Sequence, residues 1–108
     1  MKKTVIAIAA SLAPALVWAQ APAIKGDPVA GKVKALAICS GCHGVVGTKT
    51  AFPEVYSVPK IGGQNADYLV SALKAYRNGE RANETMKGLA SALKESELAN
   101  IAAYYAQK

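Results

Sequence analysis

The stretch of sequence that decides the fold is Cys39-Ser40-Gly41-Cys42-His43. On a helical turn, Cys42 lies three residues after Cys39 and His43 lies four residues after it, so all three side chains face the same side of the helix. A thiol can form covalent bonds or bind a metal, and a neutral imidazole is a common metal ligand. The spacing therefore predicts a site where a group held by two sulfurs also meets a histidine.

Three kinds of site can use these side chains. The C-x-x-C-H motif is typical of c-type haem attachment, in which the thiols bond the porphyrin vinyl groups and the imidazole reaches the iron. A thioredoxin-like pair belongs near a βαβ pattern, which this sequence lacks. A structural zinc site needs four ligands, so two cysteines and one histidine would have to recruit an acidic side chain. The sequence therefore predicts one haem c, covalently bound through Cys39 and Cys42.

The first residues have the layout of a secretory signal peptide. Lys2 and Lys3 give a positive start, an apolar run extends from Val5 to Val17, and small residues precede a cleavage site after Ala19. The apolar run is shorter than the about 20 residues that a membrane-spanning helix needs. We therefore expect a signal peptide rather than a retained anchor, export to the periplasm, and no stable membrane insertion after cleavage.

The rest of the chain is expected to form one small domain with a poor core. The 108-residue chain is 52% hydrophobic and 19% charged, which excludes a multi-domain protein and argues against disorder. Many of the apolar residues are alanines, and so small a core usually needs a disulfide, a metal or a cofactor. A bridge between the two cysteines would close almost no loop. We expect residues 1–19 to be the signal peptide, residues 20–26 a flexible arm and residues 27–108 a cofactor-filled domain.

Capping residues and hydrophobic spacing predict three helices and no strands. The first helix begins after Asp27 with Pro28 at its first position and runs into the cysteines. The second begins after Asn65 and ends at Asn78-Gly79. The last runs from about Lys94 to Ala106. Residues 44–60 are expected to form a long loop that wraps something, and residues 80–88 a polar loop.

Met86 is the candidate for the second axial position at the iron. It is the only methionine outside the expected signal peptide, and His43 is the only histidine. Its neighbours in the expected polar loop include no apolar partner at helical spacing, which argues against a role as core filler. Ligation by methionine and histidine is typical of electron transfer and raises the reduction potential.

The chain resembles the class I c-type cytochromes, of the small soluble bacterial kind. The matching pieces occur in order through the mature chain: Cys39 to Gly44, Pro59 to Gln64, Tyr68-Leu69, Met86, and Ala99 to Tyr105. Each half of the two-haem members of this group is also similar, but one attachment motif here implies one haem. Lys94 stands where the family commonly begins its last helix with Ser or Thr.

The resemblance implies an all-α fold of three main helices around the haem, with the first and last helices crossing at Gly31 beside Tyr104 or Tyr105. It also implies that the Pro59 carbonyl accepts a hydrogen bond from Nδ1 of His43, which leaves Nε2 for the iron. Gln64 is an expected neighbour of the haem or its propionates, and so is Tyr68.

The function implied is that of an electron carrier rather than an enzyme, which passes single electrons through a haem c with His43 and Met86 as ligands. Alternatives are a haem c subunit of a periplasmic dehydrogenase complex, or a protein that binds gas or peroxide if Met86 is labile. Expected partners are a membrane oxidase, a cytochrome bc-type complex or a periplasmic dehydrogenase, docking through the haem edge. The formal net charge is +6, but the scattered basic residues carry no nucleic-acid recognition motif. Six lysines are expected to be solvated, some of them around the haem edge: residues 32, 34, 49, 60, 74 and 87.

Overall fold

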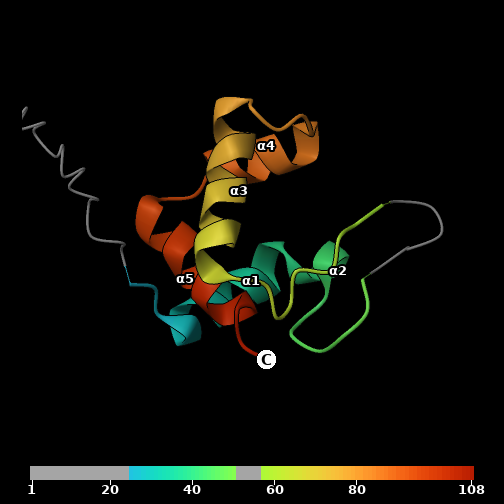
Figure 1. The fold of residues 1–108 in the computed structure, drawn as a ribbon, viewed down its shortest axis with the longest axis vertical. Helices are drawn as coiled ribbons and strands as arrows, with labels where there is room; N and C mark the ends of the chain where they lie inside the picture. The colour runs from blue at the N-terminus through green and yellow to red at the C-terminus, as the bar shows by residue number, and fades with distance from the viewer. Residues whose placement is uncertain (1–24, 51–56) are drawn as a thin grey trace, which may run out of the picture.

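The computed structural model describes residues 25–50 and 57–108, and this part of the chain contains helices and no strands. The helices are α1 (Pro28–Ile38), α2 (Ser40–His43), α3 (Ala66–Asn78), α4 (Glu84–Ser91) and α5 (Glu95–Tyr105). Helix α5 packs against both α1 and α3, and α4 packs against α3 (Figure 1). The all-α expectation is confirmed. The expected signal peptide lies outside the described residues, as do most of the expected arm and residues 51–56 of the expected loop.

The two helix starts predicted from capping residues are confirmed. The Asp27 carboxylate accepts a hydrogen bond from the backbone N–H of Val29 at 2.8 Å, and Pro28 holds the first position of α1. The Asn65 side chain accepts from the backbone N–H of Tyr68 at 3.0 Å at the start of α3. Helix α3 ends at Gly79, which has a left-handed conformation.

The expectation of a polar loop over residues 80–88 is wrong in its second half, which belongs to α4. Asn83 caps this helix, because its side chain accepts from the backbone N–H of Met86 at 2.9 Å. Met86 therefore sits in the first turn of α4. It also has apolar partners at helical spacing, namely Leu89 and Ala90, and the expectation that it lacks such partners is wrong.

Helix α5 begins at Glu95 although Lys94 lacks a capping oxygen. The carboxylate of Glu97 supports this start in another way, by accepting from the backbone N–H of Lys94 at 2.9 Å. Arg77 of α3 holds the preceding turn, because its guanidinium donates to the carbonyls of Ala90 and Leu93 at 3.2 and 2.6 Å. One arginine thus joins α3 to the end of α4 and to the residues that lead into α5.

Two lysine–glutamate ion pairs connect α5 to its neighbours, in addition to the pair between Arg77 and Glu95. Lys34 of α1 lies 2.8 Å from Glu97, and Lys74 of α3 lies 3.0 Å from Glu95. Hydrogen bonds from these lysines lower the pKa of both carboxyls. The stabilisation is therefore present above the ordinary carboxyl pKa and is lost as the pH falls. Two of the six lysines expected to be solvated are thus engaged within the molecule.

Helices α1 and α5 cross in direct backbone contact at Gly31. A Cβ atom added there would overlap the carbonyl of Asn100 and crowd the backbone nitrogen of Ile101. The crossing point predicted from the sequence is confirmed, but the neighbour is the Asn100 backbone rather than Tyr104 or Tyr105. Asn100 also binds the chain before α1, because its side-chain oxygen accepts from the backbone N–H of Asp27 at 2.7 Å.

Gly31→Ala is expected to destabilise the fold by about 1–3 kcal/mol or more, because the overlap is with backbone that cannot rotate away. Urea unfolding of the haem-loaded protein measures this change. Gly88→Ala is the matched control, since an added Cβ meets nothing within 4 Å there and alanine favours a helix by up to about 1 kcal/mol. Equal stability of the two variants would contradict the close crossing.

The core is small and comes mainly from α5. Six of the ten buried hydrophobic residues belong to this helix, and four of the ten are alanines. Among the described residues, only Tyr105 and Leu98 are both large and fully buried. The full set is Ala35, Leu69, Ala90, Leu93, Leu98, Ala99, Ile101, Ala102, Tyr104 and Tyr105. So few large side chains leave the domain dependent on additional filling.

Candidate haem attachment site

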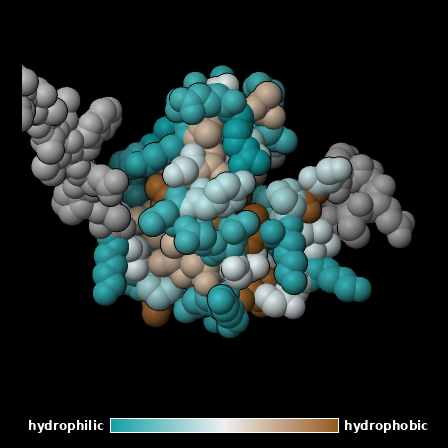
Figure 2. All heavy atoms as spheres, viewed as in Figure 1, coloured by the Kyte–Doolittle hydropathy of each residue, from teal (hydrophilic) through white to brown (hydrophobic). Residues whose placement is uncertain are grey.

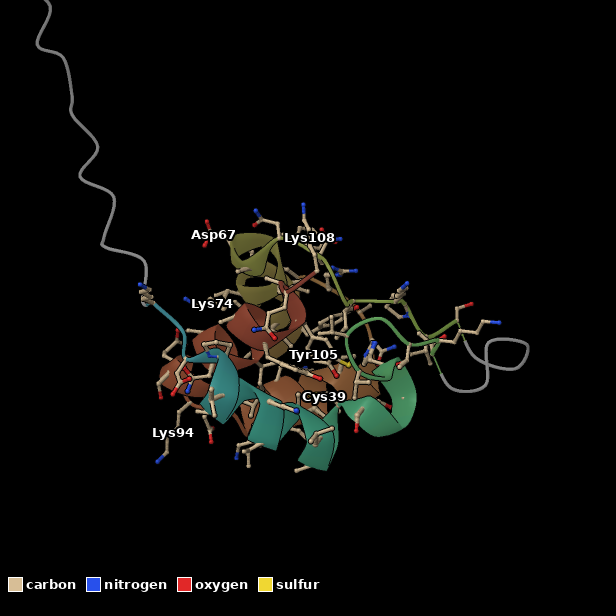
Figure 3. All side chains as sticks on the ribbon, turned by 90° about the horizontal axis from the view of Figure 1, so that it is seen from below. Cys39, Asp67, Lys74, Lys94, Tyr105 and Lys108 are labelled. Carbon is tan, nitrogen blue, oxygen red and sulfur yellow. The ribbon has the colours of Figure 1, made fainter. Side chains whose placement is uncertain are left out.

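Cys39, Cys42 and His43 lie on a single helical turn, as their spacing predicts. The carbonyl of Cys39 accepts from the backbone N–H of His43 at 2.9 Å and from that of Cys42 at 3.2 Å. Cys39 is half-buried, Cys42 is exposed, and both are free thiols. The turn therefore presents two sulfurs and one imidazole from the junction of α1 and α2, where Figure 3 labels Cys39.

The imidazole of His43 is held by the carbonyl of Pro59. The ring is buried, and its Nδ1 lies 2.7 Å from the Pro59 oxygen across 16 residues of sequence. A carbonyl can only accept, so Nδ1 carries a proton, and in the neutral imidazole this leaves the lone pair on Nε2. This is the bond that orients a metal-ligating histidine. The structure therefore prepares His43 to bind a metal through Nε2.

The residue after His43 has to be a glycine. Gly44 has a φ of +72°, and an added Cβ would lie 2.5 Å from the Thr48 hydroxyl oxygen and 2.6 Å from the Lys49 carbonyl oxygen. The chain can thus turn sharply away from the imidazole at this point.

Tyr105 anchors the attachment turn to α5. Its hydroxyl donates to the Gly44 carbonyl at 2.7 Å across 61 residues of sequence, and the side chain is fully buried. Burial raises the pKa of its phenol, so the hydroxyl remains a donor. The sequence analysis placed Tyr105 near the crossing of the first and last helices but missed this bond. No local pattern could have shown it, because the partner is a backbone carbonyl far away in sequence.

Tyr105→Phe is expected to cost about 1–3 kcal/mol, because the change leaves the Gly44 carbonyl without its donor. The free energy of unfolding of the haem-loaded protein measures this cost. Tyr104→Phe is the matched control, since no hydrogen bond of the Tyr104 hydroxyl is found within residues 25–50 and 57–108. A loss of the same size in both variants would show that the bond to Gly44 contributes nothing.

The thiol of Cys39 lacks the character of a redox nucleophile. Burial raises its pKa to about 11. Thioredoxin-like enzymes need the opposite shift, because the thiolate is the attacking species. This environment disfavours the thiol–disulfide alternative and suits a sulfur that becomes a thioether.

The other candidate residues occupy different environments. Met86 is half-buried in α4, and in Figure 1 α2 and α4 lie on the same side of α3. Gln64 is exposed, and its side chain accepts from the backbone N–H of Asn65 at 3.0 Å. Tyr68, in the first turn of α3, is 51% exposed and accepts from Arg81 at 3.3 Å. The structure thus joins His43 to Pro59 and leaves Gln64 and Tyr68 facing solvent.

The residues present fit a haem group. The turn offers two free sulfurs beside an imidazole whose Nε2 is available, and the alanine-rich core contains few large side chains. Hydrophobic atoms reach the surface beside α2, below the largely hydrophilic atoms that cover α4 (Figure 2). Two hollows, of about 430 and 270 Å³, lie elsewhere and are not lined by the candidate haem residues.

Comparison with known proteins agrees with this geometry. The family model for cytochrome c matches residues 29–107. Cytochrome c4 of Thiocapsa roseopersicina is 41% identical over 88 residues, which are 82% of this chain and 43% of the relative. Cytochrome c-554(548) of Halomonas halodenitrificans is 40% identical over 86 residues, 77% of this chain and 98% of the relative. The cytochrome subunit of sulfide dehydrogenase from Chlorobaculum tepidum is 32% identical, over 78% of this chain and 72% of the relative.

A solved structure shows the same fold. The structure of Acidithiobacillus ferrooxidans cytochrome c4 matches with a TM-score of 0.60 and 27% identity, covering 82% of this chain and 54% of that chain. The chain spans about half the length of its cytochrome c4 relatives. The class I fold and the covalently bound haem c expected from the sequence are confirmed by these matches. From its attachment turn, its helical arrangement and these matches, the chain belongs to the cytochrome c family.

Proposed function

We propose that this protein is a periplasmic electron carrier whose haem c is attached through Cys39 and Cys42 and ligated by His43 and Met86. The observation that carries the proposal is the 2.7 Å contact between His43 Nδ1 and the Pro59 carbonyl, on the same turn as both free thiols. A covalently attached group next to an oriented imidazole is the arrangement of an electron-transfer haem.

Each side chain has a distinct task in this proposal. The haem supplies a one-electron change between Fe(II) and Fe(III), and the protein supplies orientation and electrostatics. Cys39 and Cys42 fix the group in place, and Pro59 keeps His43 in one tautomer. The thioether of Met86 would be the second protein ligand of the iron and would keep small molecules away from it. The bound group would then supply one-electron transfer without a substrate site.

Two further assignments belong to the same proposal. Gln64 borders the haem or its propionates, which its exposed place before α3 allows. The periplasmic location rests on the basic start, apolar run and small residues of the N-terminal 19 positions. In the described part of the chain, no helix is long and apolar enough to cross a membrane.

The test uses protein secreted from a bacterium that attaches haem to exported cytochromes. We expect a sharp low-spin spectrum in the reduced state and a haem that acidified organic solvent does not extract. Cys39→Ala and Cys42→Ala should each leave one thioether that still holds the haem, so only the loss of both cysteines should make the haem extractable. Complete extraction from the wild-type protein would show that the bond is not covalent, and a high-spin reduced spectrum would favour a gas- or peroxide-binding protein.

A second candidate function is that of a haem c subunit in a periplasmic dehydrogenase. The similarity to the cytochrome subunit of sulfide dehydrogenase favours it. The two candidates share the haem site and differ in assembly. Size-exclusion chromatography of a mild periplasmic extract separates them, because a free carrier elutes near 11.2 kDa or less and a subunit elutes with its dehydrogenase.

A further inference from the structure

Helix α1 presents hydrophobic side chains to solvent on the face opposite its buried side. Val29 is 74% exposed, Val33 69% and Leu36 49%. Their spacing of four and three residues places them on one stripe, here called the outer face of α1. Gly31 and Ala35 form the opposite, buried side against α5. A surface helix normally turns polar side chains outward, so the outer face of α1 has the composition of a contact surface.

The outer face of α1 leads directly to the attachment turn. Leu36 precedes Cys39 by three residues, which corresponds to about 5 Å along the helix axis. The Ser40 hydroxyl donates to the Leu36 carbonyl at 3.1 Å, and this bond joins the end of α1 to the start of α2. A protein that covers the outer face of α1 would lie beside the haem attachment site.

The charged side chains within α1 are positive, and the one carboxylate beside this face, that of Asp27, caps the helix start at Val29. Lys32 is exposed on α1 next to the apolar stripe, and the helix contains no acidic residue. Lys34 is neutralised by Glu97, whereas Lys32 takes part in no ion pair within the described ranges. Two copies that met through this face would bring their lysines together, in a chain whose net charge is already +6. The charge therefore selects an acidic partner over a second copy.

We propose that the outer face of α1, formed by Val29, Val33 and Leu36, docks a redox partner protein through an apolar patch bordered by Asp or Glu side chains. The proposal rests on the electron-carrier function and adds to it the surface and the chemistry of the partner. A lipid surface fits less well, because membrane-binding helices carry many basic residues and large side chains such as Trp and Phe. Here three aliphatic side chains and one free lysine form the patch, and α5 covers the other side of the helix (Figure 3).

The test measures electron transfer by the haem-loaded protein. The probes are washed membranes of the source bacterium as electron acceptor and its periplasmic extract as donor, with the rate followed by haem absorbance. The double variant Val33→Gln/Leu36→Gln should lower the rate with one of these probes about tenfold below saturation, because apolar contacts in a docked complex are lost. The variant Val33→Ile/Leu36→Met keeps an apolar surface and should retain the rate.

Charge reversal provides a second arm with a matched control. Lys32→Glu should slow the reaction at low ionic strength and weaken its salt dependence, because the acidic rim is then repelled. Lys108→Glu changes the net charge equally, but Lys108 lies on the far side of α5 from α1 in Figure 3. It should leave the rate close to that of the wild-type protein.

The outcomes separate this proposal from the function on which it rests. All variants must keep the wild-type spectrum and melting temperature, which their exposed positions allow. Wild-type rates in the glutamine variant with both probes would overturn the docking surface and leave the carrier function intact. A wild-type protein that exchanges electrons with neither probe would overturn both. The wild-type protein and the glutamine variant are also compared for dimer formation and for binding to phosphatidylglycerol vesicles. If the glutamine variant abolishes either property without a change in rate, the face belongs to another occupant and the proposal is overturned.

Discussion

Met86→Ala is expected to lower the reduction potential by on the order of 0.2 V, a fraction of the about 0.8 V over which axial ligands shift haem potentials. A neutral thioether favours Fe(II), so its removal stabilises Fe(III). The same change should open the axial position to carbon monoxide, because the thioether no longer fills it. Potentiometric titration measures the first effect, and the absorbance change of the reduced protein under carbon monoxide measures the second.

Met86→His is the informative companion variant. Imidazole supports Fe(III) better than a thioether does, so the potential should again fall, but the axial position stays filled and carbon monoxide should not bind. Met86 lies in the first turn of α4, whose start is fixed by Asn83, so both variants keep the backbone in place. Rapid binding of carbon monoxide by the wild-type protein at neutral pH would show that Met86 does not hold the position, and the gas-binding alternative would replace the carrier.

The second large effect concerns folding without haem. We expect the chain made in a cytoplasm without haem attachment to lose most of the about 5–15 kcal/mol that stabilises a typical domain. Within residues 25–50 and 57–108, only Tyr105 and Leu98 are large and fully buried, and four of the ten buried hydrophobic residues are alanines. The remaining apolar burial cannot offset the entropy of ordering the chain.

Circular dichroism and thermal melting compare the haem-free chain with the haem-loaded protein. The haem-free chain should show low helicity and a broad transition. The secreted Cys39→Ala/Cys42→Ala variant tests whether a chain without covalent haem can still fold. Added haem can still bind His43 in this variant and should restore part of the helicity. A cooperative melt of the haem-free chain at the temperature of the haem-loaded protein would refute the dependence on haem.

Docking through the outer face of α1, as proposed above, would fix the direction from which a partner approaches. If Val33 and Leu36 dock a partner, the partner is selected by apolar contact and oriented by Lys32, rather than drawn only by a ring of lysines. Two of the six lysines expected to be solvated, Lys34 and Lys74, are already paired with glutamates of α5. Fewer free charges then remain for steering, which raises the weight of the apolar patch.

The failure of one sequence expectation has a simple physical cause. The polar composition of residues 80–88 favoured a loop around Met86. Yet Asn83 followed by Glu84, with apolar residues at Met86, Leu89 and Ala90, also contains a helix start. The helix is short, and packing on α3 together with the bonds from Arg77 supports it. Propensity alone does not decide such a helix, because tertiary contacts provide most of its stability.

The sequence by itself determined the features that depend on near neighbours. The spacing of Cys39, Cys42 and His43 fixes one side of one helical turn, and Asp27 and Asn65 set helix starts through bonds two or three residues away. Only the tertiary structure decided which distant groups meet these elements. The Pro59 carbonyl binds His43 across 16 residues of sequence, and the Gly44 carbonyl accepts from Tyr105 across 61. The Asn100 carbonyl packs against Gly31 across 69 residues. Every residue carries such a carbonyl, so no side-chain pattern marks the one that the packing of α1 on α5 brings into place.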